Sequence, residues 1–126
     1  METVSKFLAV AVGGAFGASA RYLLNQILAG FFPAFPFATF LINITGSFVL
    51  GFFLTLTADR FVVSDYWRLF FAVGFLGAYT TFSTFEFETF EFARERDFLN
   101  ALLYILLSLI VGFVSVAAGV WLAKRF

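Results

Sequence analysis

Residues 77–85 read GAYTTFSTF, which places a glycine and four threonine or serine hydroxyls among aromatic rings inside an apolar stretch. A helix that faces lipid has no use for so many hydroxyls, whereas a protein-lined path for a small polar ion does. Irregular or polar backbone is stable at membrane depth only where protein buries it or where it lines a cavity. We therefore predict that a membrane-crossing helix is broken near Gly77–Thr80 and that this segment carries the function.

The composition around this segment is that of an integral membrane protein. The 126 residues are 62% hydrophobic and 13% charged, with a mean hydropathy of +0.97, whereas soluble domains carry about 25% charged residues. No Asp, Glu, Lys or Arg occurs within Tyr22–Ala58, Leu69–Phe85 or Phe98–Ala123. Because a membrane helix needs about 20 mostly apolar residues, these stretches contain most of the spans.

The sequence predicts an all-α membrane protein with four transmembrane helices in a single domain, residues 1–126. The expected spans are Val4–Ala29, Phe37–Thr57, Trp67–Arg94 with its break near Gly77–Thr80, and Phe98–Ala123. Residues 85–92 alternate phenylalanine with polar side chains at a strand-like period of two. We still expect helix there, since an open sheet edge is not viable in a membrane.

Several function classes are excluded or unsupported by composition. The chain has no His and no Cys, which removes imidazole proton relays, thiol chemistry and the usual zinc sites. The net charge is zero and no nucleotide-binding motif is present, so nothing favours a nucleic acid or nucleotide partner. No acid–base pair or nucleophile constellation occurs either, so we do not expect an enzyme.

Small residues recur at every fourth position of the first span, at Ala9, Gly13 and Gly17, followed by Arg21. Such a stripe lets another helix approach closely, and helix packing is the favoured interpretation of the glycines. A buried Arg21 would cost about 2.5–3.5 kcal/mol unless carbonyls or an anion satisfied it. Snorkelling or structural pairing of Arg21 is favoured over an anion-binding role.

Two other helices carry polar stripes. The second span places Thr39, Asn43, Ser47 and Gly51 on one face, and the fourth places Tyr104, Ser108, Gly112 and Ser115 on one face. Each stripe is explained equally well by interhelical hydrogen bonds and by a polar lining of a pore. Their coincidence with the hydroxyl-rich break favours the pore.

After the break, Phe82 and Phe85 lie three residues apart and share a helix face, next to Ser83 and Thr84. The edge of a phenylalanine ring is positive, so rings held edge-on can solvate a small anion weakly. Further along, Glu88, Glu91 and Glu95 share a face near the interface. We interpret them as solvated carboxylates, with a position at a pore mouth as the alternative for Glu88.

The polar groups expected inside the spans are therefore hydroxyls, one amide, aromatic edges and one guanidinium. No carboxylate lies in any of the uncharged apolar stretches. Cation transport and proton-coupled transport normally use an embedded Asp or Glu, so these groups suit an anion. Four helices of this length do not easily enclose a pore and also hide their own polar stripes. We expect a twofold dimer.

Three segments then resemble one family. Residues 13–22, GGAFGASARY, are similar to the GGxxGAxxRY opening of the Fluc/CrcB fluoride channels. Residues 39–48, TFLINITGSF, resemble the second-helix motif of that family, and residues 74–85, GFLGAYTTFSTF, resemble its GfxGxxTTFSTF stretch. The three motifs occur in order and at compatible spacing across essentially the whole chain.

This resemblance implies passive export of fluoride through two separate pathways in an antiparallel homodimer, one chain being inserted in both orientations in the plasma (bacterial inner) membrane. The lysines and arginines agree with dual insertion, because they give only a weak orientation signal. The phenylalanines that match Phe82 and Phe85 line the pathways through their ring edges.

The resemblance also assigns roles to other residues. The residue that matches Asn43 points into the pore, those that match Tyr104 and Ser108 form a polar track, and Arg21 lies near an aqueous vestibule. The carbonyls that match Gly77 and Thr80 hold a central structural Na⁺ ion. Thr39, Ser83 and Thr84 complete the expected set of fluoride-binding positions.

Two features depart from the family or remain without a role. Some relatives carry a hydroxyl near Gly112 on the polar track, and the alternatives here are Ser115, a water, or fewer sites. The phenylalanine-rich residues 31–37 have no functional interpretation from the sequence. The alternatives to a channel are a small multidrug-type exporter, which needs an embedded carboxylate, and an accessory membrane subunit.

Overall fold

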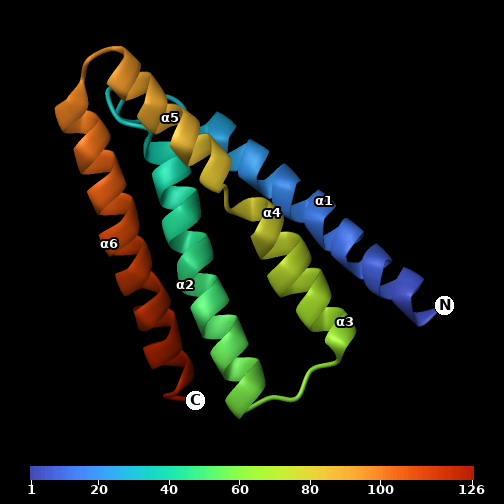
Figure 1. Ribbon diagram of the computed structural model, residues 1–126. Coiled ribbons are helices and arrows are strands. Elements are labelled where there is room, and N and C mark those ends of the chain that lie inside the picture. Colours follow the sequence, from blue (N-terminus) through green and yellow to red (C-terminus); the bar gives the residue numbers. More distant parts are fainter.

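The computed structural model describes all 126 residues and is entirely helical (Figure 1). Its elements are α1 (Glu2–Leu28), α2 (Phe37–Asp59), α3 (Asp65–Arg68), the π-helix η1 (Leu69–Leu76), α4 (Gly77–Tyr79), α5 (Phe82–Arg94) and α6 (Phe98–Ala123). By length and composition, α1, α2 and α6 are able to cross a membrane. The elements α3, η1 and α4 form one continuous rod, and α5 follows it after two residues.

The predicted break in the third helix is confirmed. Helix α4 ends at Tyr79, and Thr80 (φ −80°, ψ 155°) and Thr81 (φ −147°, ψ 112°) are extended before α5 begins. The alternating residues 85–92 are helical, as expected. The eight-residue π-helix η1 was not predicted from the sequence.

Glycines allow the helices to approach closely. A Cβ atom on Gly13 or Gly17 of α1 would collide with the carbonyl oxygens of Phe70 and Phe75 in η1. A Cβ on Gly51 of α2 would likewise lie 2.6 Å from a backbone oxygen of α6. These contacts confirm the packing interpretation of the stripe in α1.

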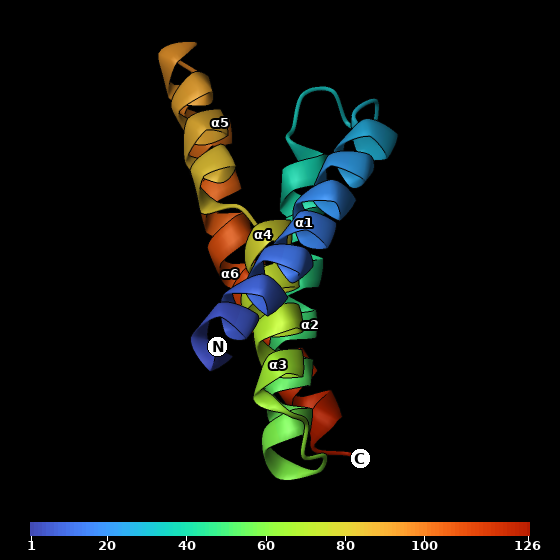
Figure 2. The ribbon, with the colours of Figure 1, turned by 90° about the vertical axis from the view of Figure 1, so that its right-hand side faces the viewer.

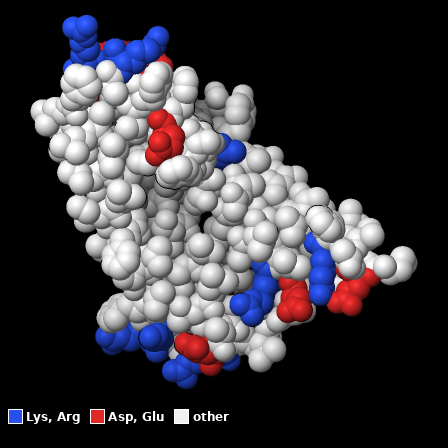
Figure 3. Space-filling model, in the orientation of Figure 1, with Lys and Arg blue, Asp and Glu red and all other residues white.

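The surface between the two ends of the molecule is largely apolar. Figure 3 shows that most charged side chains gather near the two ends, with a broad band of uncharged surface between them. Only 15 of the 126 residues are buried, so most large apolar side chains need lipid or a second chain to cover them. Phe82 and Phe113 are among them, with 72% and 78% of their surface exposed.

Candidate functional site

The break in the third helix is tied to α2 by a reciprocal pair of hydrogen bonds. The side-chain amide of Asn43 donates to the carbonyl oxygen of Thr81 at 3.0 Å, and the N–H of Thr81 donates to Asn43 Oδ1 at 2.8 Å. Asn43 thereby satisfies the peptide groups that the break removes from the helix. One amide hydrogen of Asn43 remains available for another acceptor.

Helix α1 and other residues of α2 contact the residues just before the break. Arg21 Nε of α1 donates to the carbonyl of Ala78 at 3.0 Å, which confirms the expected structural pairing of Arg21. The Tyr79 hydroxyl lies 2.9 Å from Thr45 Oγ1 of α2. Because Gly46 packs against Tyr79 and Thr80, the break is fixed from both sides.

The hydroxyls of the break also start α5. Thr81 Oγ1 accepts a hydrogen bond from the N–H of Thr84 at 3.2 Å, as a helix N-cap does. The same hydroxyl donates to Thr84 Oγ1 at 3.0 Å, and Ser83 Oγ lies 3.5 Å away. Thr81 is therefore a structural centre of the site, and the candidate residues Ser83 and Thr84 lie beside it.

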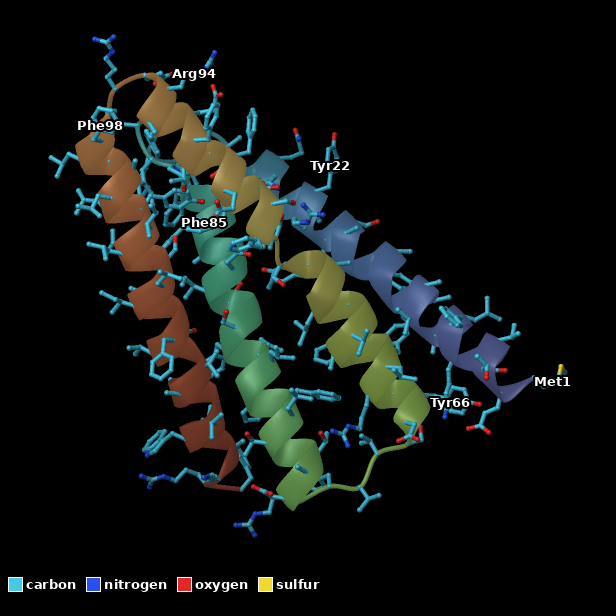
Figure 4. All side chains as sticks on the ribbon, in the orientation of Figure 1. Met1, Tyr22, Tyr66, Phe85, Arg94 and Phe98 are labelled. Atoms are coloured by element: carbon cyan, nitrogen blue, oxygen red, sulfur yellow. The ribbon has the colours of Figure 1, made fainter.

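A cavity of about 310 Å³ opens against the break, and we call it the central cavity. Its lining includes Asn43, Gly77, Thr80, Phe82, Phe85 and Ser108, so it brings together six of the predicted site residues. Phe82 is exposed, whereas Phe85 has only 6% of its surface exposed. Figure 4 labels Phe85, which comes from α5 and lies beside α2 and α6.

The hydroxyl oxygen of Ser108 is the only buried side-chain polar atom of the protein without a hydrogen-bond partner. Its Oγ belongs to a residue that lines the central cavity. Leaving a buried hydroxyl unsatisfied costs about 1–3 kcal/mol, so this hydroxyl is suited to a ligand or a water in the cavity. Among the predicted track residues it is the one most clearly able to donate to an ion.

Glu88 does not point into solvent, which corrects the interpretation of this residue as a solvated carboxylate. Its Oε1 accepts a hydrogen bond from Thr39 Oγ1 at 2.6 Å, and its Oε2 accepts one from the Tyr104 hydroxyl at 2.9 Å. Thr39 and Tyr104 are buried, with 3% and 0% of their surfaces exposed. Since the carboxylate is drawn in between α2 and α6, Glu88 belongs to the candidate site.

Aromatic rings surround Tyr104, which donates to this carboxylate. The rings of Phe35 and Phe85 meet the Tyr104 ring in T-shaped contacts, with centroids 5.2 and 5.0 Å apart. Phe92 contacts the same ring at 6.2 Å. Tyr104 is thus held in place from three directions, with its hydroxyl directed at Glu88.

The other members of the polar stripes divide between packing and the cavity. Ser47 lines the central cavity. Ser115 donates instead to the carbonyl of Ile44 at 2.8 Å, and Gly112 packs against Ile44. The Ser115 proton is thus used in holding α6 against α2, which favours a water or fewer sites over Ser115 among the alternatives for the track near Gly112.

Sequence reasoning kept Glu88 only as the alternative, at a pore mouth, and gave Thr81 no separate role. Glu88 continues the three-residue spacing of Phe82 and Phe85, so the argument that placed the two rings on one face also covers it. Thr81 was overlooked because its role depends on Asn43, which is 38 residues away in the sequence.

Comparison with known proteins identifies the family. Residues 8–120 match the family model of the CrcB-like proteins, described as Camphor Resistance (CrcB). The chain belongs to the CrcB-like family. The CrcB-like chain is a multi-pass membrane protein, since three of its helices are long and apolar enough to cross a membrane and its relatives are named as ion channels, a class of transporter and not of enzyme.

Three relatives illustrate this similarity, each named a fluoride-specific ion channel FluC. The chain is 42% identical over 122 residues to that of Sulfurihydrogenibium sp. strain YO3AOP1, which covers 96% of this chain and 98% of the relative. It is 44% identical to that of Thermococcus kodakarensis, over 94% and 95% of the two chains. It is 43% identical to that of Solibacter usitatus, over 95% and 99%.

Proposed function

We propose that this chain forms a fluoride-selective channel through which the anion leaves the cytoplasm by passive electrodiffusion. The observation that carries the proposal is the buried, unpartnered hydroxyl of Ser108 in a cavity shared with Phe85 and Asn43. Hydroxyl, amide and ring-edge donors replace water around a small anion. The names of the relatives, which are nearly equal in length to this chain, support fluoride as the ion.

The path continues from the central cavity toward the hydroxyls of Tyr104 and Thr39. Both hydroxyls donate to Glu88, and a fluoride ion that reaches them needs the same protons. Because two anions cannot share these donors without repulsion, fluoride displaces the carboxylate as it passes. Ready exchange of one anion for another meets the requirement that a conducted ion is bound and also released.

The proposal includes an antiparallel dimer with two pathways. The largely exposed ring of Phe82 lines the central cavity, and a second copy of the chain would cover both. Ser83, Thr84 and Arg21 complete the set of proposed fluoride-contacting positions, with Arg21 at the entrance. The weak asymmetry of basic residues supports insertion in both orientations.

A structural Na⁺ ion is proposed at the centre of this dimer. No group of His, Cys, Asp or Glu side chains is able to hold a metal, so the ion would rest on backbone carbonyls of Gly77 and Thr80. A Cβ on Gly77 would meet only the carbonyl oxygen of Ala72, at 3.9 Å, and both Gly77 and Thr80 line the central cavity, so the residues fit the ion. Bound there, Na⁺ would neutralise the carbonyl dipoles of the break.

Fluoride efflux from liposomes that carry the purified protein tests the function. A fluoride electrode should record rapid loss of fluoride, and chloride should be retained.

Phe82→Ile and Phe85→Ile should reduce the fluoride rate by at least about tenfold while the oligomeric state is unchanged, because the positive ring edges are lost. Phe113→Ile, at an exposed ring of α6 outside the central cavity, is the matched control. Wild-type rates in both pore variants would contradict the pathway.

The same liposomes separate the channel from the exporter alternative. That alternative needs a carboxylate at membrane depth, and Glu88, which is hydrogen-bonded between α2 and α6, is the candidate for it. An exporter is driven by a proton gradient, whereas a channel needs only the fluoride gradient and a counter-ion path. Fluoride efflux at equal pH on both sides supports the channel, and efflux only under a pH gradient contradicts it.

A further inference from the structure

A second cavity of about 410 Å³ lies under the loop that joins α1 to α2, and we call it the loop cavity. One wall is formed by residues 28–39 and the other by α5. Figure 2 shows that this loop and α5 diverge at this end of the molecule. The volume is within the range of about 300–1,000 Å³ that small-molecule sites occupy.

The walls of the loop cavity are mainly aromatic. Six rings line it, from Phe31, Phe32, Phe35, Phe37, Phe87 and Phe92. Phe32 has a φ of 51°, in the left-handed region that residues with a side chain seldom adopt. Its ring meets that of Phe37 in a T-shaped contact at 5.1 Å. Such strain persists only where the surroundings impose it, and it is common at ligand-binding positions.

The charges of the loop cavity are all negative. Glu88, Glu91 and Glu95 line it, and no lysine or arginine does. Glu91 is paired with Arg94 at 2.6 Å, whereas neither Glu88 nor Glu95 forms a salt bridge. The half-buried Glu88 carboxylate thus lines a cavity walled by rings and has no cationic partner. A small organic cation is complementary to both the rings and the carboxylate.

We propose that the loop cavity binds small quaternary ammonium cations and that a bound cation closes the ion path. Ring faces and carboxylates together recognise a weakly hydrated organic cation, whereas they repel anions. Closure follows because Thr39 and Glu88 line this cavity and also form the hydrogen bond at the end of the proposed path. The closure, unlike the binding, rests on the proposed channel function.

Binding is tested by calorimetric titration of the detergent-solubilised protein with tetramethylammonium, with tert-butanol as a neutral probe of similar shape. The alcohol should not bind. Phe32→Leu and Glu95→Gln should each weaken tetramethylammonium binding by about three- to tenfold, because each removes part of the cation's attraction. Phe90→Leu and Glu86→Gln change the same residue types on α5 outside the cavity and should bind as the wild type does.

Fluoride efflux in the presence of tetramethylammonium tests the closure. The wild type should slow as the cation concentration rises through its measured dissociation constant, and Phe32→Leu should need about three to ten times more cation. No binding by folded protein, equal binding of the alcohol, or equal weakening in the control variants would overturn the site. Tetramethylammonium binding that does not slow fluoride efflux would overturn the proposed closure of the path. Absence of fluoride efflux before any cation is added would instead contradict the proposed function.

Discussion

Glu88 brings a carboxylate into a segment where the sequence otherwise offers an ion only hydroxyl, amide and ring-edge donors. It is stable there because each of its oxygens accepts a hydrogen bond, one from the Thr39 hydroxyl and one from the Tyr104 hydroxyl. The arrangement was not predictable from local spacing, since the two donors come from helices that are distant in the sequence. The roles proposed for Phe85 and Ser108, in contrast, follow from the stripes that the sequence displays.

Tyr104→Phe isolates one of these hydrogen bonds while it keeps the ring and its three aromatic contacts. We expect the free energy of unfolding in detergent to fall by about 1–2 kcal/mol, since a hydrogen bond to a charged group is lost inside a membrane protein. Fluoride efflux should also fall, because the track loses a donor. Tyr66→Phe, at a tyrosine with 41% of its surface exposed, is the control and should change neither quantity. An unfolding free energy equal to that of the wild type would show that the Tyr104 hydroxyl does not hold Glu88.

At the scale of the elements, the spans and the break were predictable and the π-helix was not. Apolar length marks α1, α2 and α6, and the GAYTTFSTF run marks the break. The π-helix depends on contacts between helices. Gly13 and Gly17, one α-helical turn apart, face the carbonyls of Phe70 and Phe75, which are five residues and about one π-helical turn apart. A single sequence does not show that pairing.

Gly17→Ala tests whether this close contact holds the rod formed by α3, η1 and α4 against α1. The new methyl group would collide with the backbone of Phe75, and backbone is unable to move aside as a flexible side chain does. We expect a loss of about 1–3 kcal/mol in the free energy of unfolding, as for other overpacked sites. Gly30→Ala is the matched control, because nothing lies within 4 Å of its Cβ position, and it should stay within about 0.5 kcal/mol of the wild type. Equal stabilities of the two variants would rule out the glycine contact as a stabilising feature.

For the whole molecule, the remaining question is what covers the exposed ring of Phe82 and the open side of the central cavity. Charge patterning gives only a weak orientation, and the fold leaves a broad apolar surface between its charged ends (Figure 3). A lipid-covered cavity with an unpartnered hydroxyl is costly, whereas a second copy would cover it with protein. An antiparallel pair also uses both orientations that a weak charge bias permits.

Dual insertion predicts a distinctive labelling pattern in intact cells. The chain contains no cysteine, so Ala34→Cys and Ser64→Cys each introduce a single thiol, in exposed loops at opposite ends of α2. With both orientations present, a membrane-impermeant thiol reagent should label about half of each variant, since each loop is then outside in half of the copies. A single orientation would instead give nearly complete labelling of one variant and none of the other, and would exclude the antiparallel dimer. Permeabilised cells, in which both thiols are accessible, provide the reference for complete labelling.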